Sequence, residues 1–222
     1  MRFIIREQEY EKLVAAGRLH YLSAGVETGA VESYRLTQAV DGFSVMRIDL
    51  DRRESTEANS TLFHLLLDPY GRPERVKLRR LSPADSSEVD VLVDDESFNI
   101  SRTSEADVVR EEMKRPAGFG LLIPTAVGLG LFVHGNPGRR SAQAISLDET
   151  RRLAPLSASL EIDPLDEEEM TVTGQLVAVR PYLIRQKGAK CKVWLDDHGL
   201  PVRLDDEDGA LAVEHRYVRQ RR

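Results

Sequence analysis

The stretch "LDPYGRPER", residues 67–75, is built on a pattern that returns in "LDDHGLPVR", residues 195–203. Both stretches read Leu-Asp-x-x-Gly-x-Pro-x-Arg, and an alternating apolar segment precedes each of them. Glycine accepts the positive φ of a tight turn, aspartate accepts hydrogen bonds from turn amides, and proline opens a strand where no amide donor is needed. Every shared position therefore has a local structural reason. The repeat predicts two hairpin corners of one kind rather than a functional signature used twice.

The charged residues of each copy suggest a contact across the corner. We expect Arg75 and Arg203 to project from the outgoing strands toward Asp68 and Asp196. The shared residues of one copy supply one carboxylate and one guanidinium, which are too few ligands for a metal site. We therefore assign no binding role to the pattern itself.

Alternation of apolar and polar residues with a period of two predicts two antiparallel meanders, at residues 18–103 and 158–219. The strands expected are 18–23, 31–38, 43–51, 60–68, 74–81, 87–95 and 97–103 in the first meander, and 170–180, 182–186, 189–197, 201–206 and 208–219 in the second. Short strands joined by tight turns leave little room for crossover helices. The fold class is mainly β with a few helices. Whether the meanders form one curved antiparallel sheet or two stays open.

Helices are expected outside the meanders. Residues 5–16 place Tyr10, Leu13 and Val14 on one side of a helical wheel, and Gly17 stands where a helix would end. The sequence therefore predicts a short helix before the first meander.

The segment between the meanders, residues 104–157, is predicted to consist of helix and loop. Residues 104–118 are charged and compatible with a helix. The apolar segment 119–134 favours a buried helix, which would cover or plug the concave side of the sheet. A buried strand stays open there, because Gly128 and Gly130 weaken a helix.

Composition limits the class of protein. The 222 residues suffice for one sizeable core, and 41% hydrophobic with 31% charged residues is typical of a globular chain. No linker is long or flexible enough to separate two domains, so residues 1–222 are predicted to form a single domain. The net charge of -6 disfavours nucleic acid as a partner. Cys191 is the only cysteine, which excludes an intrachain disulfide.

No targeting or membrane segment is apparent. The first residues become charged soon after a few apolar ones, without the features of a signal peptide. The longest apolar stretch, residues 118–135, is interrupted by one proline and several glycines, so we expect no membrane span. These features predict a cytoplasmic location.

A search for catalytic motifs gives no site. The five histidines lack metal-ligand spacing, and His64 is interpreted as a satisfied core histidine. Residues 204–215 resemble a calcium loop, but Leu204 and His215 occupy its first and last ligand positions. Phosphate loops, dinucleotide fingerprints and nucleophile elbows are absent. We therefore expect no catalytic residue, no metal and no cofactor, and we favour a protein that is not an enzyme.

The order of the expected elements resembles that of bacterial half-barrel ligand carriers, namely the periplasmic lipoprotein-carrier group and the related putative glycolipid-binding family. The meanders, the apolar segment 119–134 and the corners in "LLLDPYGRPERV" and "VWLDDHGLPVRL" carry this resemblance. It implies a strongly curved sheet wrapped around helices, with an apolar cavity between them.

Three functions follow from this sequence, in order of preference. The first is non-catalytic binding of an apolar or amphipathic, lipid-like molecule in a cavity between sheet and helix, whose lining residues the sequence does not identify. The second is an interaction or assembly module that pairs through sheet edges or through the face of Trp194, including pairing into a homo-oligomer. The third is an unrecognised hydrolase.

Overall fold

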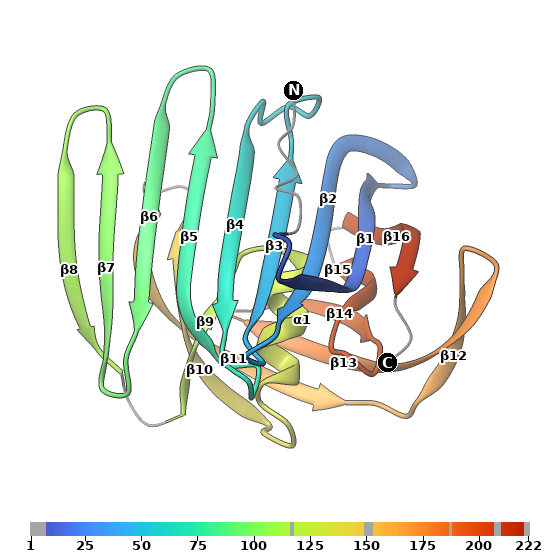
Figure 1. The fold of residues 1–222 in the computed structure, drawn as a ribbon. Helices are drawn as coiled ribbons and strands as arrows, with labels where there is room; N and C mark the ends of the chain where they lie inside the picture. The colour runs from blue at the N-terminus through green and yellow to red at the C-terminus, as the bar shows by residue number, and fades with distance from the viewer. Residues whose placement is uncertain (1–7, 116–117, 149–152, 187, 207–209, 220–222) are drawn as a thin grey trace. The chain divides into compact units, whose positions relative to one another are not determined.

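The computed structural model describes residues 8–115, 118–148, 153–186, 188–206 and 210–219 (Figure 1). These residues form two sheets, an antiparallel meander of eight strands and a mixed sheet of seven, together with one short helix. The mainly β fold class is thus confirmed, with two sheets. Among the described residues neither sheet is curled or closed, so the expected half-barrel curvature is wrong.

The chain divides into two compact units. The first unit comprises Met1–Gly17, Ser33–Pro116 and Val218–Arg222, and the second comprises Arg18–Glu32 and Ala117–Tyr217. Two long strands at the start of the meander contribute residues to both units. Each unit is described by itself below.

The meander follows the chain from strand to strand (Figure 1). Its strands are β1 (Glu11–Ser23), β2 (Val26–Ala39), β3 (Ser44–Asp51), β4 (Ser60–Leu67), β5 (Pro73–Leu81), β6 (Ser86–Val93), β7 (Ser97–Ser104) and β8 (Val108–Lys114). Side chains of alternate residues share a face of the sheet, so period-two sequences separate an apolar from a polar face. The cross-strand row Met46, Leu65, Val76, Val91 and Ile100 is buried on the apolar face.

The second sheet is formed by strands from the other half of the chain. Its strands are β9 (Phe119–Leu122), β10 (Ser141–Asp148), β11 (Ala154–Pro164), β13 (Gln175–Gln186), β14 (Ala189–Leu195), β15 (Pro201–Asp206) and β16 (Ala210–Arg219), and β12 (Glu168–Val172) pairs with β13 alone. β9 is parallel to β10, because helix α1 (Ala126–His134) carries the chain from one strand to the next. This parallel pair lies outside the predicted second meander, and the described strand pairs within residues 158–219 are antiparallel, as predicted.

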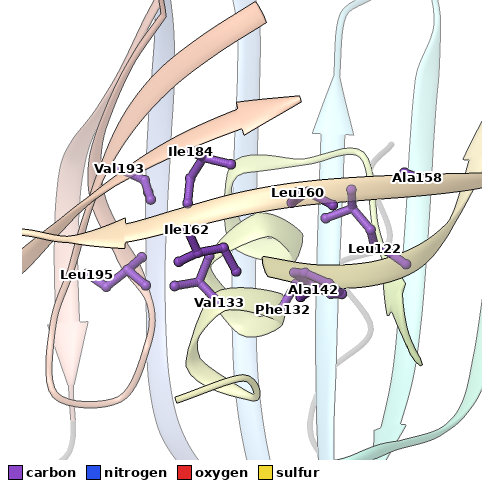
Figure 2. Close-up of a cluster of buried hydrophobic side chains, with 11 residues drawn as sticks. Leu122, Phe132, Val133, Ala142, Ala158, Leu160, Ile162, Ile184, Val193 and Leu195 are labelled. Atoms are coloured by element: carbon purple, nitrogen blue, oxygen red, sulfur yellow. The ribbon is translucent and has the colours of Figure 1, made fainter. Parts of the chain in front are cut away.

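Helix α1 packs its apolar side chains onto the second sheet. Phe132 and Val133 belong to a buried cluster with Leu160, Ile162 and Leu195 (Figure 2). The apolar segment 119–134 is thus a strand followed by a helix. A Cβ atom at Gly128 would overlap Ile123, so close packing requires the glycine that weakened the helix prediction.

The first corner has the geometry that the repeat predicts. Gly71 has a φ of +78°. The Asp68 carboxylate accepts hydrogen bonds from the amides of Tyr70 (2.8 Å) and Arg72 (2.9 Å). Burial alone would raise the pKa of Asp68, but bonds from the Arg72 amide, the Arg72 guanidinium and the Tyr70 amide hold it below its ordinary value.

The second corner repeats this geometry atom for atom. Gly199 has a φ of +72°, and the Asp196 carboxylate accepts bonds from the amides of His198 (2.9 Å) and Leu200 (3.0 Å). In both copies the strand pairing shifts register just before the aspartate. The interpretation as a repeated structural corner is confirmed.

The expected arginine contacts at the corners are wrong. Arg75 pairs with Asp90 on the neighbouring strand, and Arg203 pairs with Asp205 on its own strand. The non-repeated Arg72 contacts Asp68 instead. An arginine at the third position of an outgoing strand lies close to residues on the same face of the sheet, either across the strand pair or two residues along its own strand.

Two predicted helices are strands. Residues 11–16 of the predicted helix 5–16 belong to β1, and residues 5–7 lie outside the described residues. Ala15 and Leu19 are fully buried there, and small side chains concealed the alternation. Residues 108–114 form β8, whose alternate side chains are half-buried. Pairing with β7 overrides the helix preference of its Arg, Glu and Lys residues.

Strand boundaries in the second half of the sequence also differ. Residues 141–148 and 154–157 are strand rather than loop, and residues 168–180 form a hairpin that turns at Thr173 and Gly174. The predicted strand 182–186 continues β13 through Pro181, which stands opposite Trp194 in the register.

The two corners differ in what covers them, and this difference is testable. A Cβ atom at Gly71 would meet nothing within 4 Å, whereas one at Gly199 would overlap His134 of α1. We expect Gly71→Ala to lower the free energy of unfolding by about 1–2 kcal/mol, from backbone strain alone. Gly199→Ala adds overpacking and should cost about 2–5 kcal/mol. Urea unfolding followed by circular dichroism measures both, and equal losses would show that α1 does not constrain the second corner.

Candidate functional site

The part of the chain that the structure describes holds no group of three or more His, Cys, Asp or Glu side chains able to bind a metal ion. Helix α1, with nine residues, is too short to cross a membrane, and no other described helix qualifies. The search for a site therefore turns to grooves and to buried polar groups.

A groove of about 790 Å³ lies over the polar face of the first unit, across β4 to β8. Its lining combines charged, hydroxyl and apolar side chains and comprises Leu62, His64, Lys77, Leu78, Arg79, Glu88, Val89, Asp90, Leu92, Asn99, Ile100, Ser101, Thr103, Arg110, Glu111 and Glu112. No residue of the segment 119–134 lines it. The groove is thus a different place from the sheet-helix cavity that the sequence suggested.

A single cross-strand row runs along the middle of this groove. The register aligns His64, Lys77, Asp90, Ser101 and Arg110 on five successive strands. Neighbouring Cα atoms in such a row are about 5 Å apart. We call these five residues the polar row.

Asp90, the carboxylate of the polar row, already pairs with two cationic side chains. Asp90 accepts two hydrogen bonds from Arg75, of 2.8 and 2.5 Å, and lies 3.8 Å from the Lys77 ammonium. Hydrogen bonding by Arg75 lowers the pKa of Asp90, against a smaller opposing effect of burial. The charges of Arg75 and Asp90 offset each other, so these two residues and Lys77 together carry one net positive charge. The Lys77 side chain is 57% exposed.

His64 lies half-buried on the same face, and its Nε2 atom has no hydrogen-bond partner among the described residues. The interpretation of His64 as a satisfied core histidine is therefore wrong. Burial, followed by the charges of Arg47 and Lys77, lowers the pKa of this imidazole, so it is neutral at pH 7. A buried ring nitrogen without a partner costs about 1–3 kcal/mol, which a water or a ligand in the groove would recover.

Beyond His64 the row continues into a closed cluster of polar side chains. Arg47 donates to Glu11 (2.8 Å) and to Thr37 (2.9 Å), and Thr37 donates to Glu11 (2.9 Å). Burial would raise the pKa of Glu11, but bonds from Arg47 and Thr37 hold it below its ordinary value. All three side chains are satisfied, so this cluster serves the fold.

The second unit buries one carboxylate completely. Glu32 has no exposed surface and accepts hydrogen bonds from the Tyr21 hydroxyl (2.6 Å) and from the amides of Ala126 (3.0 Å) and Val127 (2.9 Å). These amides open α1, where helix amides lack partners within the helix. Burial raises the pKa of Glu32, while these bonds and one from Thr125 offset part of the rise. Because its oxygens are engaged by the protein, Glu32 holds the helix and offers no open site.

The tryptophan face proposed for assembly is covered. Trp194 is 7% exposed and packs with Val172, Val179 and Val202, with Met170 against them. Its indole N–H donates to Glu168 of β12. The β12–β13 hairpin therefore covers this face within the second unit.

Cys191 shows no sign of reactivity. Burial, with a smaller contribution from the charge of Asp206, raises the pKa of its thiol to about 11. The thiolate is the nucleophile, so this thiol is inert at neutral pH.

Comparisons with known proteins add little to this geometry. No protein-family model matches the chain, and no curated protein sequence matches it. Among solved structures, the chain is similar to a DUF1089 family protein from Pseudomonas aeruginosa, with 13% identity and a TM-score of 0.49 over 91% of this chain and 92% of that one. No function passes from that protein to this one.

The role of Glu32 predicts a characteristic pH dependence. Its folded pKa lies above the ordinary value of 4.5, so the stability it contributes is fully present below about pH 4.5 and decreases as the pH rises through the folded pKa. Glu32→Gln does not titrate and sets an NH₂ group against helix amides, which should cost about 1–3 kcal/mol. The stability difference between the two proteins should shrink from pH 4 to pH 8 in urea unfolding.

Glu27→Gln is the matched control, because Glu27 is exposed on the same strand and its loss should change stability by less than about 0.5 kcal/mol. A difference at Glu32 that grows with pH would show that the hydrogen bonds outweigh burial and that the folded pKa is lowered.

Proposed function

We propose that the protein is a non-catalytic binding protein for a small amphipathic anion, held in the groove over β4 to β8. The observation that carries the proposal is the polar row, in which a solvent-accessible ammonium stands beside a saturated carboxylate and an unpartnered imidazole nitrogen. Ligand sites combine apolar lining with a few convergent polar groups, and the groove offers both.

The charge arrangement favours an anionic head group. Arg75 neutralises Asp90, and Arg79 pairs with Glu88 at 2.6 Å. Lys77, which shares Asp90 with Arg75, and Arg110 are then the cations of the polar row that a ligand could use. The hydroxyl of Ser101 lies two strands away in the same row. An ammonium and a hydroxyl together suit a carboxylate, sulfonate or phosphate group.

The apolar part of the ligand would lie on leucines of the same face. Leu62 and Leu92 flank the polar row, and Leu92 is 45% exposed. An exposed leucine on a charged sheet face is unfavourable in water, and an apolar ligand segment would cover it. This combination suits an amphipathic molecule better than a fully polar one.

The original expectation placed a lipid-like ligand between sheet and helix. There the side chains of α1 and the second sheet form a buried cluster, which includes Phe132, Ala142 and Ala158 (Figure 2). The groove of the first unit is therefore the better place for an amphipathic ligand.

Catalysis is not part of the proposal. Among the described lining residues Asp90 is ion-paired, and the cross-strand neighbours of Ser101 in the register are Asp90 and Arg110 rather than a histidine. A hydrolase would need a nucleophile and a base within hydrogen-bond reach of one another. The groove has the chemistry of a binding site.

The proposal predicts that Lys77→Glu weakens binding of an amphipathic anion. With 1-anilinonaphthalene-8-sulfonate as the probe, we expect the dissociation constant to rise about tenfold, from the loss of one attraction and the gain of one repulsion. Fluorescence titration at low salt measures the change. Lys12→Glu makes the same charge change at an exposed position of β1 that does not line the groove, and it should leave binding within about twofold of wild type.

Equal affinities in the two variants would show that the probe binds elsewhere. Native mass spectrometry of the freshly purified protein tests for a co-purified ligand, and Leu92→Asp should remove any that is found.

A further inference from the structure

We propose that the protein forms a two-fold dimer in which β8 pairs antiparallel with β8 of a second copy, with Glu111 on the symmetry axis. In the described part of the first unit, β8 hydrogen-bonds with β7 on one side and no strand follows on the other (Figure 1). Seven residues of edge backbone, about 23 Å, are thus open to a further strand.

The sequence of β8 is complementary to itself in this orientation. Residues that stand opposite each other in an antiparallel pair point to the same face. With Glu111 on the axis, Arg110 stands opposite Glu112 of the second copy, twice by symmetry. On the other face, Val109 stands opposite Met113 of the second copy. Two charge pairs and two apolar pairs form across the junction.

Neighbouring registers lack this match. Moving the axis to Arg110 places two arginines opposite each other, and moving it to Glu112 does the same for two glutamates. The register on Glu111 also has one like-charged pair on its axis, but the other two registers lose the Arg110–Glu112 pairs as well. Val108 faces Glu112 when the axis is at Arg110, and Arg110 faces Lys114 when it is at Glu112. The register centred on Glu111 is therefore favoured over both.

The charges that would form the junction are unused within one chain. Arg110 and Glu112 are exposed and make no ion pair with any residue that the structure describes. Glu111 already pairs with Arg102 at 2.6 Å, so the two carboxylates that meet at the axis each bring a guanidinium. The central repulsion is thereby offset.

The edge carries only part of the usual protection against pairing. Proteins protect edges with charged side chains, inward-pointing charges, proline or a bulge, and in β8 the charges, with Glu111 on the apolar face, are the protection present. β8 contains two residues of each sign and no proline, its pairing with β7 has an unbroken register, and Val108 is 55% exposed. A junction this small buries limited surface, so we expect a weak dimer with a dissociation constant of about 10–500 µM.

Charge exchange tests the register directly. Arg110→Glu and Glu112→Arg each place like charges opposite each other and should weaken self-association at least about tenfold. An equimolar mixture of the two variants restores both opposite-charge pairs, so it should form a heterodimer. The double variant, with both residues exchanged, should dimerise like wild type. Sedimentation equilibrium at up to about 1 mM protein measures all four samples.

The expected result is similar dissociation constants for wild type, the double variant and the mixture, and values at least about tenfold higher for both single variants. A wild type that stays monomeric at about 1 mM would overturn the proposal, because even a millimolar complex would then be half-formed. Single variants that dimerise as tightly as wild type would overturn the register. The inference does not rest on the groove, and Lys77→Glu should dimerise like wild type.

Discussion

A single buried carboxylate organises the second unit. Glu32 lies in β2, near the start of the chain. Its carboxylate accepts hydrogen bonds from the first amides of α1, which follow about ninety residues later. Because those amides would otherwise be unsatisfied in an apolar environment, the helix can begin at one place only. The position of α1 then determines which parts of the second unit pack against the helix. Gly130 packs against the carbonyl of Gly199, where a Cβ atom would come within 2.7 Å of the oxygen. The helix is therefore in close contact with the second corner.

The two corners show how one local solution serves two surroundings. Each uses a buried aspartate, a glycine of positive φ and a proline that restarts the strand after a register shift. The first corner stands free, with Tyr70 84% exposed and Arg72 stacked over its ring. The second is covered by a helix. The residues shared by the two copies are those that form the turn. The residues that differ determine which parts of the protein each turn contacts.

Alternation predicted most strands of the meander, because their apolar face is buried along its whole length. It failed where burial is incomplete or side chains are small, as in β8 and β1. The sequence does not decide between helix and strand at α1, because the glycine that weakens a helix is required by a tertiary contact, the close approach of Ile123 to Gly128. The candidate site was not predicted at all. The polar row unites residues from five strands, and only the register, which turns and register shifts determine together, shows that His64, Asp90 and Arg110 are aligned.

The covered tryptophan has a practical consequence. The chain contains one tryptophan, and the centroid of its indole, in the second unit, lies 4.3 Å from the Lys192 ammonium and 5.2 Å from the Arg203 guanidinium carbon. Indole emission depends on nearby charge and on exposure to water, so intrinsic fluorescence reports the integrity of the second unit. Far-ultraviolet circular dichroism reports strands of both units. A comparison of the two signals during unfolding would therefore reveal whether the units melt together or in sequence, with no label introduced.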